Sequence, residues 1–109
     1  MTRTPDVVLE DLRTVRAGIA RGPQHLYDAE VNAETLELAA QKAEDLAFFT
    51  NEGSVDARKA AARLAAEAEL TAAVVGRAEY NRVKAKIKAL ELEQTSLQTE
   101  LKYMVGEGA

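Results

Sequence analysis

Apolar residues recur three or four positions apart along most of this chain, and charged or polar residues separate them. The first line of such residues consists of Val8, Leu12, Val15 and Ile19. This spacing is typical of one face of an amphipathic α-helix. Thr4 suits an N-cap, and Pro5 suits the first helical position, where its missing N–H is not needed. The pattern therefore predicts a helix over residues 4–21.

The dipeptide Gly22-Pro23 follows this helix, and we interpret it as a kink or a short break, because Pro cannot donate a backbone hydrogen bond. A second helix is expected over residues 23–49. Its apolar line alternates three and four apart, like the seam of a coiled coil built from small side chains. The members of this line are Leu26, Ala29, Ala33, Leu36, Ala40, Ala43 and Ala47.

The segment "TNEGS" is the clearest turn signal in the chain. Gly53 suits the left-handed residue that ends a helix, and Ser54 suits the N-cap of the next one. A third helix is expected over residues 55–104, because Gly76 costs only about 1 kcal/mol relative to Ala. Its apolar residues are Ala57, Ala61, Leu64, Ala68 and Val75 in the first half, then Val83, Ile87, Leu90, Gln94, Leu97, Leu101 and Met104. We expect a register slip at Gly76 to Tyr80 and a disordered tail over residues 105–109.

These elements predict an all-α fold with a single domain over residues 1–109: a long antiparallel helical hairpin whose first arm is kinked at Gly22-Pro23. The Ala seams would then face each other, and the larger side chains of residues 8–19 would face those of residues 83–104. An alternative fold breaks the long helix at Gly76 and closes a compact monomeric bundle. Gln94 is either a polar device that fixes register or a residue at the edge of the seam.

Two helices cannot cover all of this apolar surface, so we expect a homodimer that forms a four-helix bundle. The orientation of its two chains is left open. The residues expected at the interface between copies or with a partner are Tyr27, Val31, Leu38, Phe49, Leu70, Val74 and Leu92.

The composition argues against an enzyme. The chain has no Cys and one His, His25, so the usual thiolate, zinc and haem ligand sets are absent. Asp28 lies one turn after His25, but no nucleophile accompanies this pair, and we interpret His25 as a solvent-facing residue. Carboxylate pairs such as Glu30 with Glu34 lack the Glu-x-x-His pattern of helical metal sites. We expect no catalytic residue, no cofactor and no metal.

Basic residues cluster on a chain whose net charge is −4. In the predicted hairpin, Arg13, Arg16 and Arg21 lie opposite the segment "RAEYNRVKAKIK", which forms a basic belt. The belt residues of this segment are Arg77, Arg82, Lys84, Lys86 and Lys88. Such a belt could contact the phosphates of a nucleic acid without sequence preference. The alternative is that acidic residues such as Glu34, from the same or a partner chain, neutralise it.

The stretches "SVDARKAAARLAAEAEL" and "RVKAKIKALELEQTSLQTELKYM" resemble the small all-helical proteins of actinobacterial tailed bacteriophages. The resemblance covers roughly residues 54–104 and implies an accessory phage protein, in some cases encoded near recombination or replication genes, with no residue roles to carry over. Secreted helical hairpins of the Trp-x-Gly type have a similar length, but the turn "FFTNEGS" lacks their Trp.

No uncharged apolar stretch approaches the ~18 residues that a membrane span needs, and the acidic N-terminus does not resemble a signal peptide. We therefore expect a soluble protein of the cytoplasm, which would be the host cytoplasm if a phage encodes it. The functional hypothesis is a non-enzymatic, oligomeric scaffold or adaptor that binds a protein partner. The alternative hypothesis is a nucleic-acid-associated accessory factor for recombination or replication that uses the basic belt.

Overall fold

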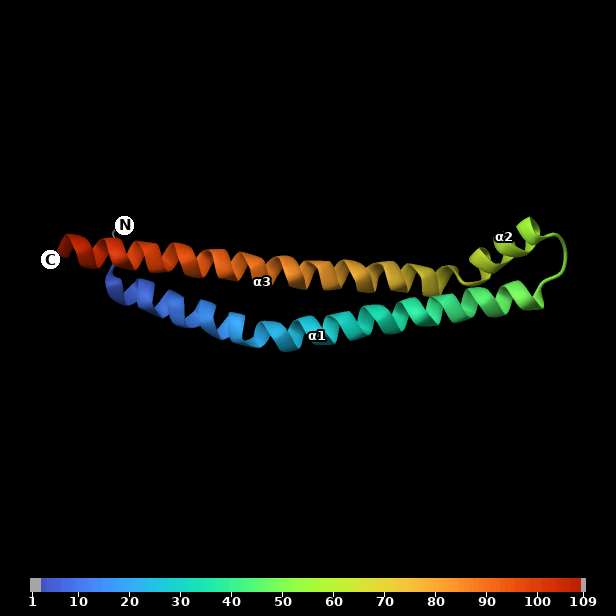
Figure 1. Cartoon of the computed structure of the whole chain (residues 1–109), viewed down its shortest axis with the longest axis horizontal. Coiled ribbons are helices and arrows are strands. Elements are labelled where there is room, and N and C mark those ends of the chain that lie inside the picture. The colour runs from blue at the N-terminus through green and yellow to red at the C-terminus, as the bar shows by residue number, and fades with distance from the viewer. Residues whose placement is uncertain (1–2, 109) are drawn as a thin grey trace. The chain divides into compact units, whose positions relative to one another are not determined.

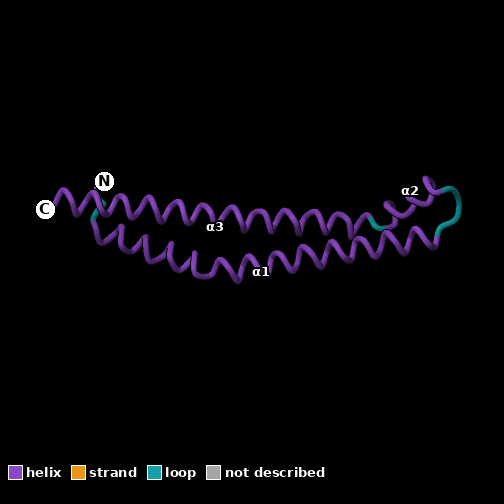
Figure 2. The backbone as a smooth tube through the Cα atoms, viewed as in Figure 1, coloured by secondary structure: helices purple, strands orange, loops and turns teal. Residues whose placement is uncertain are grey.

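The computed structural model describes residues 3–108, and these residues form three α-helices: α1 (Pro5–Thr50), α2 (Val55–Ala65) and α3 (Glu67–Gly108) (Figure 1). No β-strand occurs among the described residues. In the backbone trace, a segment of α1 lies antiparallel to a segment of the second half of the chain within each of the two units described below (Figure 2). The predicted all-α hairpin is therefore confirmed.

The chain divides into two compact units, each a pair of antiparallel helical segments. The terminal unit consists of Met1–Leu26 and Val83–Ala109, and the turn unit is Tyr27–Arg82. Each unit buries a different kind of side chain along its seam, and each is described separately below.

Helix α1 starts where the sequence predicted. The backbone N–H of Val7 donates to the hydroxyl of Thr4 at 3.4 Å, and the N–H of Val8 donates to the Thr4 carbonyl at 3.2 Å. A kink or a short break was expected at Gly22-Pro23, and of these the break is absent, because α1 continues through Pro23 to Thr50. A residue before Pro is normally forced out of the helical conformation by a clash that involves its Cβ. Gly22 has no Cβ, so one helix replaces the predicted helices 4–21 and 23–49.

The turn between the two arms has the predicted chemistry. Gly53 has a φ of +114°, which L-residues rarely adopt, and the Ser54 hydroxyl accepts a hydrogen bond from the N–H of Ala57 at 3.2 Å. Arg58 closes the turn, since its Nε donates to the carbonyl of Phe48 at 3.1 Å and its guanidinium lies 4.4 Å from the centre of the Phe48 ring. This contact fixes the end of α1 against the start of α2.

The predicted single helix over residues 55–104 is divided, though not at Gly76. Ala66 separates α2 from α3 with φ −96° and ψ 12°, but its N–H still reaches the Ala62 carbonyl at 3.0 Å. Gly76 lies inside α3. At the other end α3 extends to Gly108, so most of the tail predicted to be disordered is helical, while residue 109 lies outside the described residues.

The terminal unit has a core of large aliphatic side chains. Val8, Leu12, Val15 and Leu97 are buried there. Four partly buried residues pack against them: Ile19, Leu90, Leu101 and Met104. The predicted packing of the first line of α1 on the last heptads of α3 is confirmed. Gln94 is half-buried.

The turn unit has a different core, because all of its buried hydrophobic residues are alanines: Ala33, Ala40, Ala62, Ala66 and Ala73. Gly76 is also buried, and a Cβ built on it would lie 2.7 Å from Leu36 Cδ1 and 3.5 Å from Ala33 Cα. Small side chains on both sides of the seam allow this close approach of the two helices.

The seam predicted for the first half of the second arm is wrong. Leu64 and Val75 were assigned to it, but they are 74% and 63% exposed, and Ala57 and Ala68 are exposed as well. The buried or half-buried positions are instead 62, 66, 73, 76 and 80, and their spacing continues to the half-buried Val83. No register slip at Gly76 to Tyr80 is therefore needed.

Candidate interaction surfaces

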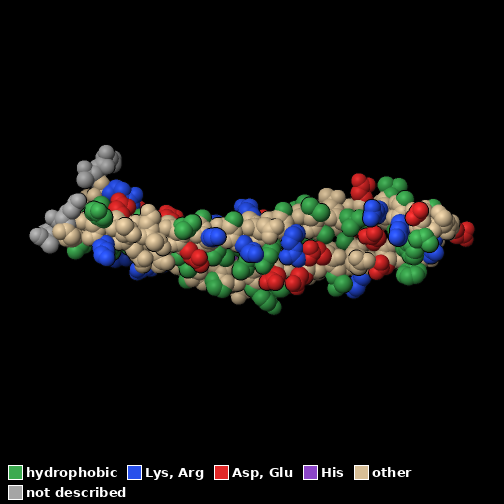
Figure 3. Space-filling view, turned by 45° about the horizontal axis from the view of Figure 1, so that its top comes forward, with side chains coloured by type: hydrophobic (Ala, Val, Ile, Leu, Met, Phe, Trp, Pro, Cys, Tyr) green, Lys and Arg blue, Asp and Glu red, His purple; other side chains and the backbone are tan. Residues whose placement is uncertain are grey.

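Large apolar side chains are exposed mainly on the turn unit. Nine of the fourteen exposed large hydrophobic residues in the described part of the chain belong to it. They are Tyr27, Val31, Leu38, Leu46, Phe49, Val55, Leu64, Val74 and Val75. Figure 3 shows apolar side chains at the surface between charged ones. The unit thus buries alanines and exposes its larger apolar residues.

The predicted interface residues follow this pattern, with one exception. Tyr27, Val31, Leu38, Phe49 and Val74 are exposed on the turn unit, and Leu92 is exposed on the terminal unit. Leu70 is half-buried. Prediction missed Leu46 and Val55, and it placed Leu64 and Val75 in the seam although they are exposed.

One stretch of α1 on the turn unit combines apolar and acidic residues, and we call it the acidic face. It consists of Tyr27, Asp28, Glu30, Val31, Glu34 and Leu38. Tyr27, Val31 and Leu38 are 63%, 43% and 56% exposed, and they lie four and seven positions apart on one side of the helix. No Lys or Arg occurs between Gln24 and Gln41.

Two of the predicted belt residues, Arg77 and Arg82, are neutralised within the turn unit. Arg77 forms a bidentate pair with Glu37, and its guanidinium also lies 5.2 Å from the centre of the Tyr80 ring. The hydrogen bond from Arg77 lowers the pKa of Glu37 below its ordinary value. Arg82 pairs with Glu79 through two hydrogen bonds of 2.9 and 2.7 Å, which lowers the pKa of Glu79 in the same way.

The remaining predicted belt residues belong to the terminal unit, where they form what we call the basic band. Residues 12–26 and 83–90 contain six Lys and Arg side chains and no Asp or Glu. These six are Arg13, Arg16, Arg21, Lys84, Lys86 and Lys88. The two segments pack together, since a Cβ on Gly22 would lie 3.2 Å from Ile87. Among residues 3–108, Arg13 pairs with Glu10 at 3.3 Å, but Arg16, Arg21, Lys86 and Lys88 form no ion pair.

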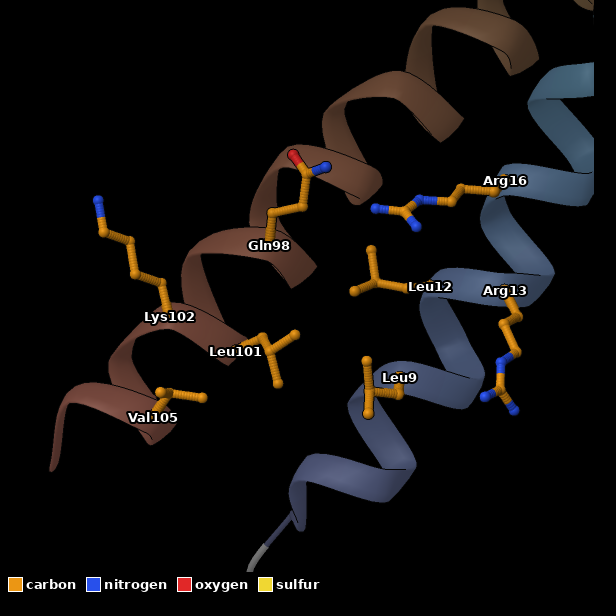
Figure 4. A pocket seen from close by; sticks show the side chains of 8 residues that line it. All are labelled: Leu9, Leu12, Arg13, Arg16, Gln98, Leu101, Lys102 and Val105. Atoms are coloured by element: carbon orange, nitrogen blue, oxygen red, sulfur yellow. The ribbon is translucent and has the colours of Figure 1, made fainter. Parts of the chain in front are cut away.

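A groove of about 410 Å³ lies between α1 and α3 in the terminal unit, and we call it the cationic groove. Its apolar lining consists of Leu9, Leu12, Leu101 and Val105. Its polar lining consists of Arg13, Arg16, Gln98 and Lys102. Figure 4 shows the apolar side chains between the two helices, with Arg16 extending toward Gln98. The groove is therefore lined by three cations and no carboxylate.

Charges on the other side of this seam have a different arrangement. Asp11 and Glu100 lie two positions after Leu9 and Gln98, which is about 200° around each helix and thus across the seam. Arg3 joins these two carboxylates, at 2.7 Å from Asp11 and 2.8 Å from Glu100. Arg3 therefore neutralises both of these carboxylates. On the groove side, Arg16 forms no ion pair with any of the described residues.

A second, smaller hollow of about 240 Å³ in the terminal unit also combines apolar and charged side chains. Leu26 and Ile87 provide its apolar lining, and Lys84, Lys88 and Glu91 its charged lining.

The two units also differ in total charge. The terminal unit carries eight Lys and Arg against seven Asp and Glu, whereas the turn unit carries six against eleven.

The catalytic candidate suggested by the sequence lies on the surface of α1. His25 is exposed. Within residues 3–108, no three His, Asp or Glu side chains are placed so that they could hold a metal ion together. In the same residues, no helix combines the length and the apolar character that crossing a membrane requires. No family model, curated protein or solved structure matches the chain.

Proposed function

We propose that this protein is a non-enzymatic helical scaffold or adaptor that works as a homo-oligomer and binds a protein partner through its helical surface. The observation that carries this proposal is the inverted distribution of apolar residues in the turn unit. Its buried hydrophobic residues are alanines, while nine larger apolar residues are exposed. Large exposed apolar patches on a folded protein usually mark an interaction site.

The magnitude of the apolar effect supports association over an extended surface. Burying a Val, Leu or Phe side chain fully contributes roughly 1.5–3 kcal/mol. Burial of half of the nine exposed residues would therefore contribute on the order of 10 kcal/mol. Association itself costs about 4–15 kcal/mol in lost freedom. Several of these residues must consequently be covered together, which favours a long helix-to-helix contact over a single anchor residue.

The proposal is tested by the mass in solution. Sedimentation velocity of the wild type over a wide range of concentration is expected to show at least twice the chain mass of 11.8 kDa. Leu38→Glu places a charge on the turn unit's exposed apolar surface and is expected to shift the protein to the single-chain mass. Ser96→Glu adds the same charge at an exposed position of the terminal unit and should leave the mass unchanged. A wild type that stays at 11.8 kDa would refute the proposal.

A second candidate function is that of a nucleic-acid-associated accessory factor, and the basic band favours it. Four of the six cations in this band, Arg16, Arg21, Lys86 and Lys88, form no ion pair among residues 3–108, and they give a local positive field on an acidic protein. If all six contacted phosphates, the logarithm of the binding constant would fall with the logarithm of salt concentration with a slope of about −4 to −5. A role as a phage accessory protein, which residues 54–104 suggest, is compatible with either candidate.

Fluorescence anisotropy with single- and double-stranded oligonucleotides at low salt tests this second candidate. Lys84→Glu with Lys88→Glu is expected to abolish salt-sensitive binding. Lys59→Glu with Arg63→Glu makes the same charge change on the turn unit and serves as the matched control. Absence of binding by the wild type, or equal binding by both variants, would remove this candidate.

A further inference from the structure

The cationic groove of the terminal unit is bordered by two ridges of exposed side chains, one on each helix. Each ridge has side chains at positions i, i+4 and i+7, which lie on one face of a helix: Leu9, Arg13 and Arg16 on α1, and Gln98, Lys102 and Val105 on α3. The buried Leu12 and the half-buried Leu101 lie between the ridges (Figure 4). Seven residues rise about 10 Å along a helix, so the groove is about two helical turns long.

The two ends of the groove differ in polarity. Leu9 lies toward the end of the groove that Val105 borders, and Arg16 extends toward Gln98 at the other end (Figure 4). Leu9 and Val105 are 39% and 64% exposed. The groove therefore has an exposed aliphatic end and a polar end that carries Arg16.

Positive charge on the groove is only partly compensated. Arg13 lies 3.3 Å from Glu10 and is therefore already paired. Arg16 and Lys102 are exposed and form no ion pair with a described side chain. No acid occurs among the eight residues that line the groove. The groove is thus complementary to an apolar surface that also carries carboxylates.

The lining also favours a helix over an extended peptide. Four of the lining side chains are aliphatic, and Gln98 alone among the eight can both donate and accept hydrogen bonds. An extended backbone would leave N–H and C=O groups without partners against this surface, whereas a helix satisfies them internally. Helices that bind in apolar grooves use anchors at i, i+3 or i+4 and i+7. Such anchors span two turns, which matches the length of the groove.

We propose that the cationic groove binds an acidic amphipathic helix of a partner protein. The inference rests on the proposed adaptor function, because it names the kind of partner and the place where it binds. Apolar anchors of the bound helix cover Leu9, Val105 and the leucines between the ridges. Carboxylates that flank these anchors pair with Arg16 and Lys102, so the bound helix completes a three-helix arrangement with α1 and α3.

A nucleic acid fits the same lining less well. Phosphates would meet Arg16 and Lys102, but the four aliphatic side chains would gain no cover from them. Bases bind without sequence preference by stacking on aromatic side chains, and none of the eight lining residues is aromatic. The apolar half of the groove therefore favours a protein helix.

Synthetic peptides test the groove in the full chain. The acidic probe is a fluorescein-labelled peptide of about 18 residues, which exceeds the length at which isolated helices are marginal. It has Leu at i, i+3 and i+7, Glu on both sides of this stripe, and Ala elsewhere. The basic probe replaces each Glu with Lys, and the polar probe replaces each Leu with Gln. In fluorescence anisotropy at low salt, the acidic probe is expected to bind at least tenfold more tightly than either of the others.

Reversal of the groove's charge is expected to reverse this preference. The groove variant, Arg16→Glu with Lys102→Glu, changes two exposed side chains, and far-UV circular dichroism should match the wild type. It should bind the acidic probe at least tenfold more weakly than the wild type does, and the basic probe at least tenfold more tightly. Lys59→Glu with Arg63→Glu makes the same change in net charge on the turn unit and should keep the wild-type preference.

Each outcome decides the proposal. Reversed preference in the groove variant, with wild-type preference in the control, supports it. Three results overturn it: no binding of the acidic probe by the wild type, equal binding of the acidic probe and either other probe, or the same preference in the two charge variants. Binding of a single-stranded oligonucleotide instead of the acidic probe, abolished in the groove variant, would assign the groove to phosphates and also overturn it.

The proposed self-association is decided separately, by the mass of the wild type in solution. A wild type that assembles but does not bind the acidic probe refutes the groove's assignment and leaves the self-association intact. A wild type of single-chain mass that binds the acidic probe with the expected preference refutes the self-association and leaves the groove's assignment intact.

Discussion

The substitution Gly22→Ala tests the close packing of α1 on α3 in the terminal unit. Gly22 is buried, and a Cβ built on it would lie 3.2 Å from Cγ1 and 3.3 Å from Cδ1 of Ile87. Ile is β-branched and has one strongly preferred rotamer in a helix, so it cannot move aside cheaply. The added methyl group also restores the clash with Pro23 that glycine avoids.

The expected magnitude follows from opposing effects. Alanine favours a helix interior over glycine by about 1 kcal/mol. Overpacking a close contact typically costs 1–3 kcal/mol. The net effect of Gly22→Ala is therefore a loss of about 0–2 kcal/mol in the free energy of unfolding. Gly106→Ala is the matched control, because no atom lies within 4 Å of its built Cβ, and it is expected to stabilise by up to about 1 kcal/mol.

Urea denaturation followed by circular dichroism measures both variants, at one fixed protein concentration because self-association would shift the midpoint. A double-mutant cycle with Ile87→Ala separates the contact from the proline effect, since only the contact is relieved when Ile87 is truncated. Favourable coupling of about 1 kcal/mol or more is expected for this pair. Stabilisation by Gly22→Ala equal to that by Gly106→Ala would refute the reasoning.

Three further changes test other parts of the fold. Pro23→Ala should stabilise the protein by about 1–3 kcal/mol in urea denaturation, because it restores a helical hydrogen bond at an exposed position; a loss would contradict the continuous helix. Leu97→Ala should cost about 2–5 kcal/mol, whereas Leu92→Ala, 65% exposed, should leave the unfolding free energy of the isolated chain nearly unchanged; equal effects would refute the assigned core. The pKa of Glu37 is lowered in the folded state by Arg77, so the stability it contributes is present at neutral pH and lost as the pH falls through that lowered pKa. Urea denaturation should therefore separate Glu37→Gln from the wild type at pH 7 but not in acid, and a difference that persists in acid would count against the ion pair.

The hairpin and the seam of α1 could be predicted because their signals are redundant. Spacings of three and four persist from Val8 to Ala47, and Gly53 with Ser54 marks the turn by two independent preferences. A short break at Gly22-Pro23 was considered because both residues disfavour a helix interior when each is taken alone. A glycine before proline removes the steric reason for ending the helix, so the pair that looked like a break is compatible with continuity.

The buried face of residues 57–76 could not be predicted from the sequence, because alanines occur on several sides of this segment. One line through it includes Leu64 and Val75, and another includes Ala62, Ala66 and Ala73. Hydrophobicity favours the first line, whereas the structure uses the second. The reason lies in the packing of both arms, because Gly76 and the alanines allow the close approach to Ala33 of α1 that Leu64 would prevent. A single helix sequence does not specify this distance.

For the interaction surfaces, the sequence predicted many of the exposed apolar and basic residues but not which of them lie together. The outward apolar residues Tyr27, Val31 and Leu38 were found because they lie off the main seam. One of the two pairings that neutralise belt residues could not be read from a local pattern, since Glu37 is 40 residues away from Arg77. The cationic groove was missed because it combines Arg16 with Lys102, which only the antiparallel alignment brings to one side of the unit.

The alanine seam of the turn unit has a consequence for how the two arms are aligned. Moving one row of alanines past the other by a heptad would set alanine against alanine once more, so the alanines alone scarcely distinguish neighbouring alignments. Unequal shapes are needed to choose among them, and in this unit they lie in the turn at Gly53 and in the contact of Leu36 with Gly76. If either feature were lost, a shift of one arm along the other would cost less free energy than unfolding of the two arms.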